Sequence, residues 1–438
     1  MSRFATEAND TFRSLRHRNF RLFFAGQFIS QTGNWLTLIG QSLLVLHLTN
    51  NNGFRVGLLT AFQFLPMLVL GMWTGVVADR SDKRRLLMIV QTCAMLQSFL
   101  LATLAFMGNP PLLALYGVAM IGGVCTAFDN PTRRSFVVEM VPVQDVQNAV
   151  SLNSALMTGA RVFGPTIAGL LITTVGYGWC FAIDGISYLA VLYGLARMNK
   201  AELRPGPVAA RAKGQLLAGL RYVRSMPELF VPLAMMSVIG TFAFNFSVVL
   251  PLFVKKTFHG TDTKFTLLYS AVSVGAFIGA LAAARKKSIE VRHVVVAAAF
   301  FGVAMAVMAA VPTLWASYPV ALFIGFTSIM FMTSSTAIVQ TRAAPEMRGR
   351  VLALQAMLLL GSTPIGGPIL GLVCQMFTAR AGFLVGAVAC AAAAAWGAVA
   401  ARRPLVPRVP QVPLGVVSAD GRRSNRQALR EIRRGPSA

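Results

Sequence analysis

The sequence predicts an all-α membrane protein with twelve transmembrane helices in two six-helix bundles and both termini in the cytoplasm. Over half of the 438 residues are hydrophobic and only 13% are charged, against about a quarter in soluble domains. Twelve apolar segments are long enough to cross a bilayer. Lys and Arg concentrate in every second connection, as they do in loops that stay in the cytoplasm.

The distribution of Lys and Arg along the chain indicates which kind of partner the positive charge faces. A net charge of +25 would suggest nucleic acid if the chain were soluble. Positive loops instead orient a membrane protein, so we expect the bilayer as a partner, no nucleic acid, and a monomer. Of the 40 Lys and Arg residues, 34 fall within residues 1–21, 79–85, 132–148, 197–226, 285–292, 341–350 and 402–438.

The apolar segments follow one another with short polar connections. The fourth is expected to end near Phe128, because Pro131 disfavours helix at the residue before it. The predicted spans are residues 22–48, 56–77, 86–107, 112–128, 148–174, 178–198, 229–254, 265–284, 294–311, 314–339, 351–376 and 382–400.

Five parts of the chain are expected, and a weak internal repeat supports the division. Gly164-Pro165 recurs as Gly367-Pro368, 203 residues later. Within the middle loop, residues 215–224 predict an amphipathic helix on the cytoplasmic membrane surface. The parts are an N-terminal cytoplasmic segment (1–21), a six-helix bundle (22–198), the central loop (199–227), a second bundle (228–401) and a basic cytoplasmic tail (402–438).

Polar side chains inside the spans are candidates for lining a cavity. Four amides of the first span are spaced i, i+4, i+7 and i+14, which places them on one helical face. Such a stripe is expected to face a water-filled cavity, or alternatively to hydrogen-bond neighbouring helices. The candidates are Gln27, Gln31, Asn34 and Gln41, with Asn245 from the seventh span.

Two charged residues inside spans are candidates for energy coupling. Arg161 lies 13 residues before Thr174, about 20 Å inside at 1.5 Å per residue, so it needs a partner or water. Asp184 could carry a proton if it is removed from water. Asp184 is also only about six residues from the outer end of its helix, ~9 Å, so a hydrated structural role is the alternative.

No catalytic, metal-binding or cofactor-binding constellation is evident, so no enzyme activity, metal or cofactor is expected. Five cysteines lie in apolar segments without metal-ligand spacing. A phosphate-binding loop of the Walker type is absent from the sequence, which argues against direct ATP drive.

A charged hairpin separates the second and third spans, and its residues resemble a known signature. The stretch Gly75-Val-Val-Ala-Asp79-Arg80-Ser-Asp82-Lys83-Arg84-Arg85 resembles the G-x-x-x-D-[RK]-x-G-[RK]-[RK] loop of the major facilitator superfamily. Asp82 stands where that family usually has Gly. A generic positive loop is the simpler interpretation. The resemblance implies a conformational gate made of Gly75, Asp79, Arg80, Lys83, Arg84 and Asp129, with Lys83 paired to Asp129.

The fifth span adds a second resemblance. Gly164-Pro165-Thr-Ile-Ala168-Gly169 resembles G-P-x-x-[GA]-G, which in this superfamily marks proton-coupled exporters. Close helix packing by small residues is the alternative. Residues 30–35 and 129–169 are similar to the branch of enterobactin, multidrug and macrolide exporters. Asn34 stands where members of that branch often have Asp, and an amide carries no proton.

These observations favour a secondary transporter of the bacterial inner membrane. It would export an amphiphilic small molecule (drug, antibiotic or siderophore-like), with protons as the coupling ion and alternating access between the two bundles. The main alternative is an importer or facilitator of the same fold for a small metabolite. A membrane sensor or scaffold would be expected to lack Asp79 and the amide stripe, which are present.

Overall fold

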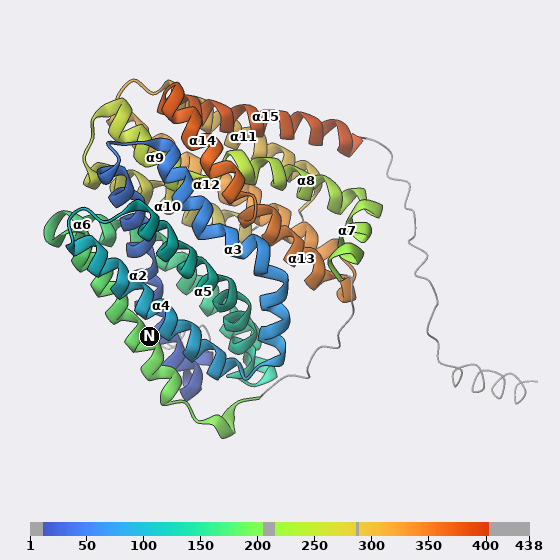
Figure 1. Ribbon diagram of the computed structural model, residues 1–438. Coiled ribbons are helices and arrows are strands. Elements are labelled where there is room, and N and C mark those ends of the chain that lie inside the picture. Colours follow the sequence, from blue (N-terminus) through green and yellow to red (C-terminus); the bar gives the residue numbers. More distant parts are fainter. Residues whose placement is uncertain (1–11, 205–214, 286–288, 403–438) are drawn as a thin grey trace, which may run out of the picture.

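The computed structural model describes residues 12–204, 215–285 and 289–402, and every regular element within them is helical. Figure 1 shows two groups of helices side by side, one coloured blue to green and the other yellow-green to red. The predicted basic tail, most of the N-terminal segment and part of the central loop lie outside the described residues. The all-helical fold class is therefore confirmed for the described part of the chain.

The first group holds the helices before residue 205, and its longest helix is bent. At Gly176 the backbone has φ 82° and ψ 174°, which interrupts α6 and is readily adopted by glycine. The elements are η1 (Arg13–Arg16), α2 (Arg18–Leu48), α3 (Gly53–Arg80), α4 (Lys83–Phe106), α5 (Leu112–Glu139), η2 (Val143–Asp145), α6 (Val146–Ala196) and η3 (Lys200–Glu202).

In the second group, two of the long segments are broken partway. The elements are α7 (Gln215–Ser225), α8 (Pro227–Phe242), α9 (Phe246–Leu252), the π-helical turn η4 (Phe253–Thr257), α10 (Asp262–Ala284), α11 (Val291–Ala310), α12 (Leu314–Arg342), α13 (Pro345–Leu360), α14 (Thr363–Met376) and α15 (Ala379–Arg402). Pro364 explains one break, because it has no N–H for the helical bond and its ring clashes with the carbonyl of the preceding turn.

The breaks lie at the same level of the second group. The first falls at Phe244 and Asn245, between α8 and α9, and the second at Gly361 and Ser362, between α13 and α14. A Cβ added to Gly240, just before the first break, would lie 3.2 Å from Oγ of Ser362. The two interruptions are therefore packed against each other.

Ten helices among the described residues are long and apolar enough to cross a membrane. The 31-residue α2 is not one of them, because its amides and hydroxyls lower its hydropathy. The bent α6 counts once in this set, although its 51 residues would extend about 77 Å as a straight helix, more than twice the ~30 Å hydrocarbon core. The chain is thus a multi-pass membrane protein.

The fourth span differs from its prediction. Helix α5 continues through Pro131 to Glu139 instead of ending near Phe128. Packing of α5 against α3 and α4 overrides the local preference of the residue before proline. This extension places Asp129 inside the helix, with 9% of its surface exposed, and not at a helix end.

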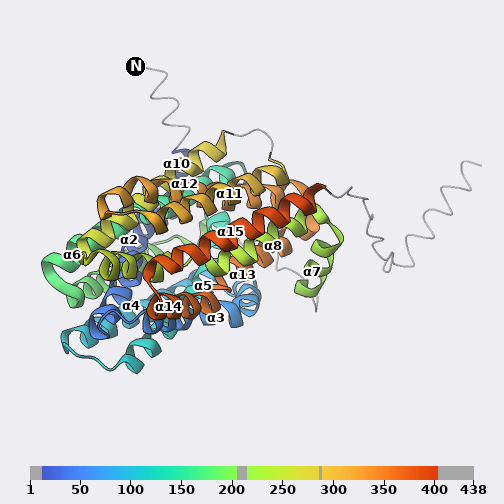
Figure 2. The same cartoon turned by 90° about the horizontal axis from the view of Figure 1, so that it is seen from above.

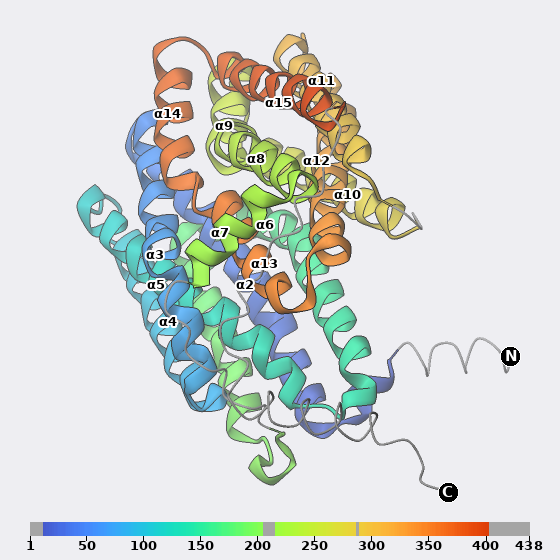
Figure 3. The same ribbon diagram turned by 90° about the vertical axis from the view of Figure 1, so that its right-hand side faces the viewer.

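The two groups contact each other mainly through α3 with α14 and α6 with α10. Figures 1 and 3 show α3 running beside α14, and Figure 2 shows the same pair from above. A Cβ added to Gly57 would lie 2.5 Å from the carbonyl oxygen of Gly367, so the backbones of α3 and α14 touch.

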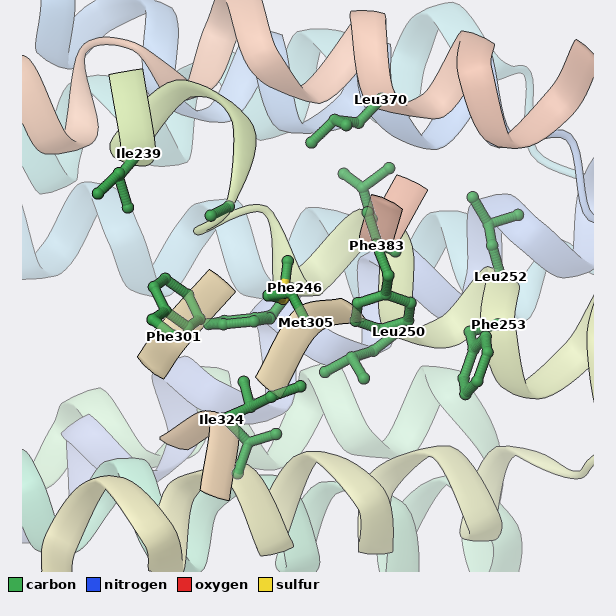
Figure 4. Close-up of a cluster of buried hydrophobic side chains, with 14 of the residues drawn as sticks. Ile239, Phe246, Leu250, Leu252, Phe253, Phe301, Met305, Ile324, Leu370 and Phe383 are labelled. Carbon is green, nitrogen blue, oxygen red and sulfur yellow. The ribbon is translucent and has the colours of Figure 1, made fainter. Parts of the chain in front are cut away.

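Buried side chains fill the second group. Phe246, Phe301, Met305 and Phe383 interleave between α9, α11 and α15 (Figure 4), and each is at most 9% exposed. The four cysteines Cys125, Cys180, Cys374 and Cys390 are buried as well. The abundant Phe and Met thus serve the core at these positions.

The predicted amphipathic helix is present as α7. Its Val223 is 2% exposed, and the hydroxyl of Tyr222 accepts a hydrogen bond from the backbone N–H of Ala344 at 3.0 Å. Part of the side expected to face the membrane therefore packs against the second group.

Candidate functional site

The charged hairpin is tied to its own bundle. Asp82 caps α4 by accepting a hydrogen bond from the backbone N–H of Arg85 at 3.0 Å. The Nζ atom of Lys83 lies 2.7 Å from Oε1 of Glu139. The guanidinium of Arg84 donates to the carbonyl oxygens of Leu195 (2.6 Å) and Ala196 (3.1 Å), which are free acceptors at the end of α6.

The predicted pair between Lys83 and Asp129 is wrong in this conformation. Because α5 extends to Glu139, that residue and not Asp129 reaches the hairpin. Asp79 and Arg80 are exposed, and the side chain of neither makes a hydrogen bond or ion pair with any residue that the structure describes. The hairpin is therefore intact, while its Asp79 is unengaged.

Asp129 belongs instead to a buried polar network in the first bundle. Its carboxylate accepts from Nε2 of Gln91 at 2.7 Å and forms an ion pair with Arg133 at 3.2 Å. Arg133 also approaches Oε1 of Gln27 at 3.5 Å. Gln31 donates to the same oxygen at 3.1 Å. Sequence reasoning missed Arg133 because its partner lies one helical turn away, inside a helix that was expected to have ended.

The amides of α2 do not act as one set. Gln41 accepts a hydrogen bond from Gln63 of α3, which matches the interhelical alternative. Gln41 and Gln27 are both buried. Asn34 is exposed and accepts from the hydroxyl of Tyr188 at 3.1 Å. In the second bundle, Asn245 is 2% exposed at the break after α8, and its Oδ1 has no hydrogen-bond partner.

Asp184 is fully buried, so the hydrated alternative for it is wrong. Its carboxyl group accepts hydrogen bonds from the hydroxyls of Thr37 at 2.5 Å and Ser98 at 2.7 Å. Ser187 lies 3.5 Å from its Oδ1. A Cβ added to Gly33 of α2 would lie 2.4 Å from the same oxygen, so α2 closes over the carboxyl group. No cation pairs with Asp184 among the described residues.

Arg161 lies on the same helix but apart from Asp184. It is exposed, midway between the start of α6 and the bend at Gly176. No hydrogen bond or ion pair links its side chain to any described residue. The two predicted coupling residues are therefore not brought together.

The Gly-Pro stretch of α6 packs against helices of both bundles. A Cβ added to Gly164 would lie 2.4 Å from Cβ of Trp35 on α2. One added to Gly169 would lie 1.9 Å from Oγ1 of Thr266 on α10. This contact is what the packing alternative predicts, and it lies at the seam between the bundles.

Polar contacts also join the bundles beyond this stretch, at the ends of the helices far from the hairpin. The hydroxyl of Tyr177 donates to Asp262 at 2.8 Å, and Lys255 lies 2.5 Å from the same carboxylate. The backbone N–H of Gly53 donates to Oε1 of Gln375 at 3.0 Å. Lys255 and Asp262 lie in a short charged connection between two apolar segments, and nothing in the sequence links them to Tyr177.

Replacing Tyr177 by Phe removes the hydrogen bond to Asp262. The free energy that holds the two bundles together at this end should fall by about 1 kcal/mol, the usual net value of one hydrogen bond. A cysteine placed at Ser270, which contacts Thr166 across the seam at 2.6 Å, would then react with a maleimide roughly fivefold faster. The measurement is the labelling rate in a background in which the exposed Cys93 is changed to Ser. Tyr193→Phe, at an exposed position of the same helix, is the control. Equal labelling rates for the two variants would show that the hydrogen bond from Tyr177 to Asp262 does not hold this end of the seam closed.

Comparison with known proteins agrees with this architecture. The profile of the transmembrane secretion effector family matches residues 9–410. The staphyloferrin A transporter of Staphylococcus aureus is 24% identical over 364 residues, covering 82% of this chain and 90% of that protein. Macrolide efflux protein A of Streptococcus pyogenes is 22% identical over 360 residues, covering 80% and 89%. Enterobactin exporter EntS of Shigella flexneri is 24% identical over 365 residues, covering 83% and 86%.

Solved structures give the same fold at low sequence identity. A D-xylose–proton symporter aligns with a TM-score of 0.70 at 14% identity, covering 86% of this chain and 96% of that chain. A bacterial homologue of the lysosomal transporter Spinster, in an inward-facing and occupied conformation, aligns with a TM-score of 0.67 at 15% identity, covering 89% and 97%. The chain therefore belongs to the transmembrane secretion effector family of major facilitator superfamily transporters.

Proposed function

We propose that this protein exports an amphiphilic small molecule, drug-, antibiotic- or siderophore-like, across the bacterial inner membrane in exchange for protons. Curated relatives with this architecture are named for siderophore and macrolide transport. The observation that carries the proposal is the uneven contact between the bundles. The hydrogen bonds across the seam join residues 53, 166 and 177 to residues 375, 270 and 262.

At the hairpin end, by contrast, no polar contact joins the described parts of the two bundles. Among the described residues, Lys83 and Arg84 make ion pairs and side-chain hydrogen bonds only within their own bundle, and the side chain of Asp79 has no partner. One end of the molecule is thus joined across the seam, while the other has no ion pair or hydrogen bond between the described parts of the bundles. Such an asymmetry is what alternating access requires of one of its two end states. Asp79 would find a partner when the hairpin end closes.

The crossing number and orientation form part of the proposal. If α2 and each arm of α6 cross the membrane separately, the ten apolar helices become twelve crossings. Positive connections then fall on one side, which places both termini in the cytoplasm. Residues 22–198 and 228–401 would move as the two halves, and one chain would suffice as a monomer.

Proton coupling is assigned to Asp184. It is the fully buried carboxyl group of the first bundle, held by hydroxyl donors and without a cation among the described residues. An uncompensated carboxylate is unfavourable in hydrocarbon, which favours binding of a proton. Arg161 would contact the transported molecule, while Asp184 carries the proton.

Asp79→Asn should cut export roughly tenfold with normal insertion, because the hairpin end could no longer close by an ionic contact. The measurement is accumulation of a panel of dyes and antibiotics in an efflux-deficient bacterial host, with and without a protonophore. Asp79→Glu, which keeps the charge, is the control. Wild-type rates in Asp79→Asn would remove the gate assignment. Accumulation in wild-type cells that the protonophore leaves unchanged would argue against proton exchange.

A further inference from the structure

An arginine in the middle of a membrane helix needs a source of negative charge or water. Arg161 has neither an ion pair nor a hydrogen bond with any described residue, and its side chain is exposed. Its place halfway along the first arm of α6 keeps it far from either end of the helix. A lipid headgroup is therefore out of its reach, and another anion must approach it.

The surroundings of Arg161 show which side of α6 it occupies. Gly164 and Pro165 follow it by three and four residues, so all three lie on one side of the helix. Gly164 packs against Trp35 of α2. The Trp35 ring in turn lies 5.9 Å from the ring of Tyr269 on α10. Arg161 therefore faces the seam between the bundles, beside an aromatic pair contributed by both.

The buried carboxylates of the first bundle do not pair with this arginine. Asp129 is already paired with Arg133 at 3.2 Å. Asp184 is enclosed by Thr37, Ser98 and Gly33, with none of its surface exposed. The guanidinium of Arg161 thus has no counter-ion among the described residues.

We propose that Arg161 binds the anionic group, a carboxylate or a similar oxyanion, of the transported molecule, whose apolar or aromatic body lies against Trp35 and Tyr269. A guanidinium matches a carboxylate with two parallel hydrogen bonds. Half-buried aromatic rings provide an apolar surface for the rest of the ligand. Side chains of a helix lean toward its N-terminus, so Arg161 is directed toward the hairpin end, where Asp79 is unengaged. The assignment rests on the proposed export function and narrows its substrate class to organic anions.

The test uses two dyes with the same fused ring system and opposite charge, fluorescein as the anion and rhodamine 123 as the cation. Binding to the purified full-length protein is followed by fluorescence anisotropy. Wild type should bind fluorescein more tightly than rhodamine 123. Arg161→Gln should lose roughly tenfold or more in fluorescein affinity, as expected for one charge-assisted contact, with rhodamine 123 affinity unchanged. Arg161→Lys should retain part of the preference.

Arg292→Gln is the matched control, since this arginine is paired with Glu290 on the surface of the second bundle at 2.9 Å. Equal fluorescein affinity of wild type and Arg161→Gln, or no preference of wild type for the anion, would overturn the proposal. Melting temperatures of the variants separate lost binding from lost folding. Dye efflux from inverted membrane vesicles is measured in parallel. Selective anion binding without transport would contradict the export function but leave the anion site standing.

Discussion

Asp184→Asn is expected to reduce proton-driven export strongly while the protein still folds and inserts. In the wild-type protein Thr37 and Ser98 donate to the carboxyl group at 2.5 and 2.7 Å. Asparagine has the same shape and keeps one oxygen that can accept from these hydroxyls. It cannot bind and release a proton. Transport driven by a pH gradient in inverted vesicles should fall roughly tenfold or more, as for a lost intramembrane proton carrier.

Two further variants separate coupling from packing at this position. Asp184→Ala leaves buried hydroxyls without an acceptor, at about 1–3 kcal/mol for each unsatisfied group, so its melting temperature should drop strongly. Ser98→Ala keeps the carboxyl group and should keep a protonophore-sensitive rate. If Asp184→Asn transports like wild type, Asp184 only holds α2, α4 and α6 together.

Among glycine-to-alanine substitutions on α3, Gly57→Ala is expected to lower export and thermal stability the most. The added carbon would lie 2.5 Å from the carbonyl oxygen of Gly367 and 2.7 Å from Cα of Pro368. Both neighbours are backbone, so α3 and α14 would have to separate. Overpacking of this kind costs about 1–3 kcal/mol, and it falls on the end of the seam that is joined in this conformation.

Gly71→Ala provides the control on the same helix. Nothing lies within 4 Å of the carbon added there, and alanine favours helix over glycine by about 1 kcal/mol. Export and thermal stability in detergent should fall for Gly57→Ala and stay level or rise for Gly71→Ala. Similar behaviour of the two variants would show that the close approach of α3 and α14 does not matter for transport.

Much of the fold could be predicted because hydrophobic length and charge placement are direct physical constraints of a bilayer. The spans of α10, α11 and α15 were placed within a few residues of their observed bounds. Helix α5 was misjudged, because a preference acting on one residue before Pro131 was given more weight than the packing of a whole helix. The breaks near Asn245 and Gly361 were not predicted, because each segment is apolar enough overall to be taken as one span, although Gly361, Ser362 and Pro364 are residues typical of a helix break.

The candidate site was predicted less completely than the fold. The sequence placed Arg161 and Asp184 inside helices but could not show that one is exposed and the other enclosed. Exposure depends on what neighbouring helices bring, such as Gly33 of α2 closing over Asp184. The partner of Lys83 was wrong for the same reason, because it depends on where α5 ends.

The aligned breaks of the second bundle have a mechanical consequence. An intact helix bends only by stretching or losing its backbone hydrogen bonds, whereas the ladder is already interrupted at Phe244–Asn245 and at Gly361–Ser362. Small residues at this level, such as Gly240, let the two segments lie against each other. We expect the pair to act as a flexible joint. The helices that follow the breaks, α9 and α14, can stay packed against α3 while the helices that precede them, α8 and α13, change their tilt. The second bundle can then bend internally as well as rotate as a unit.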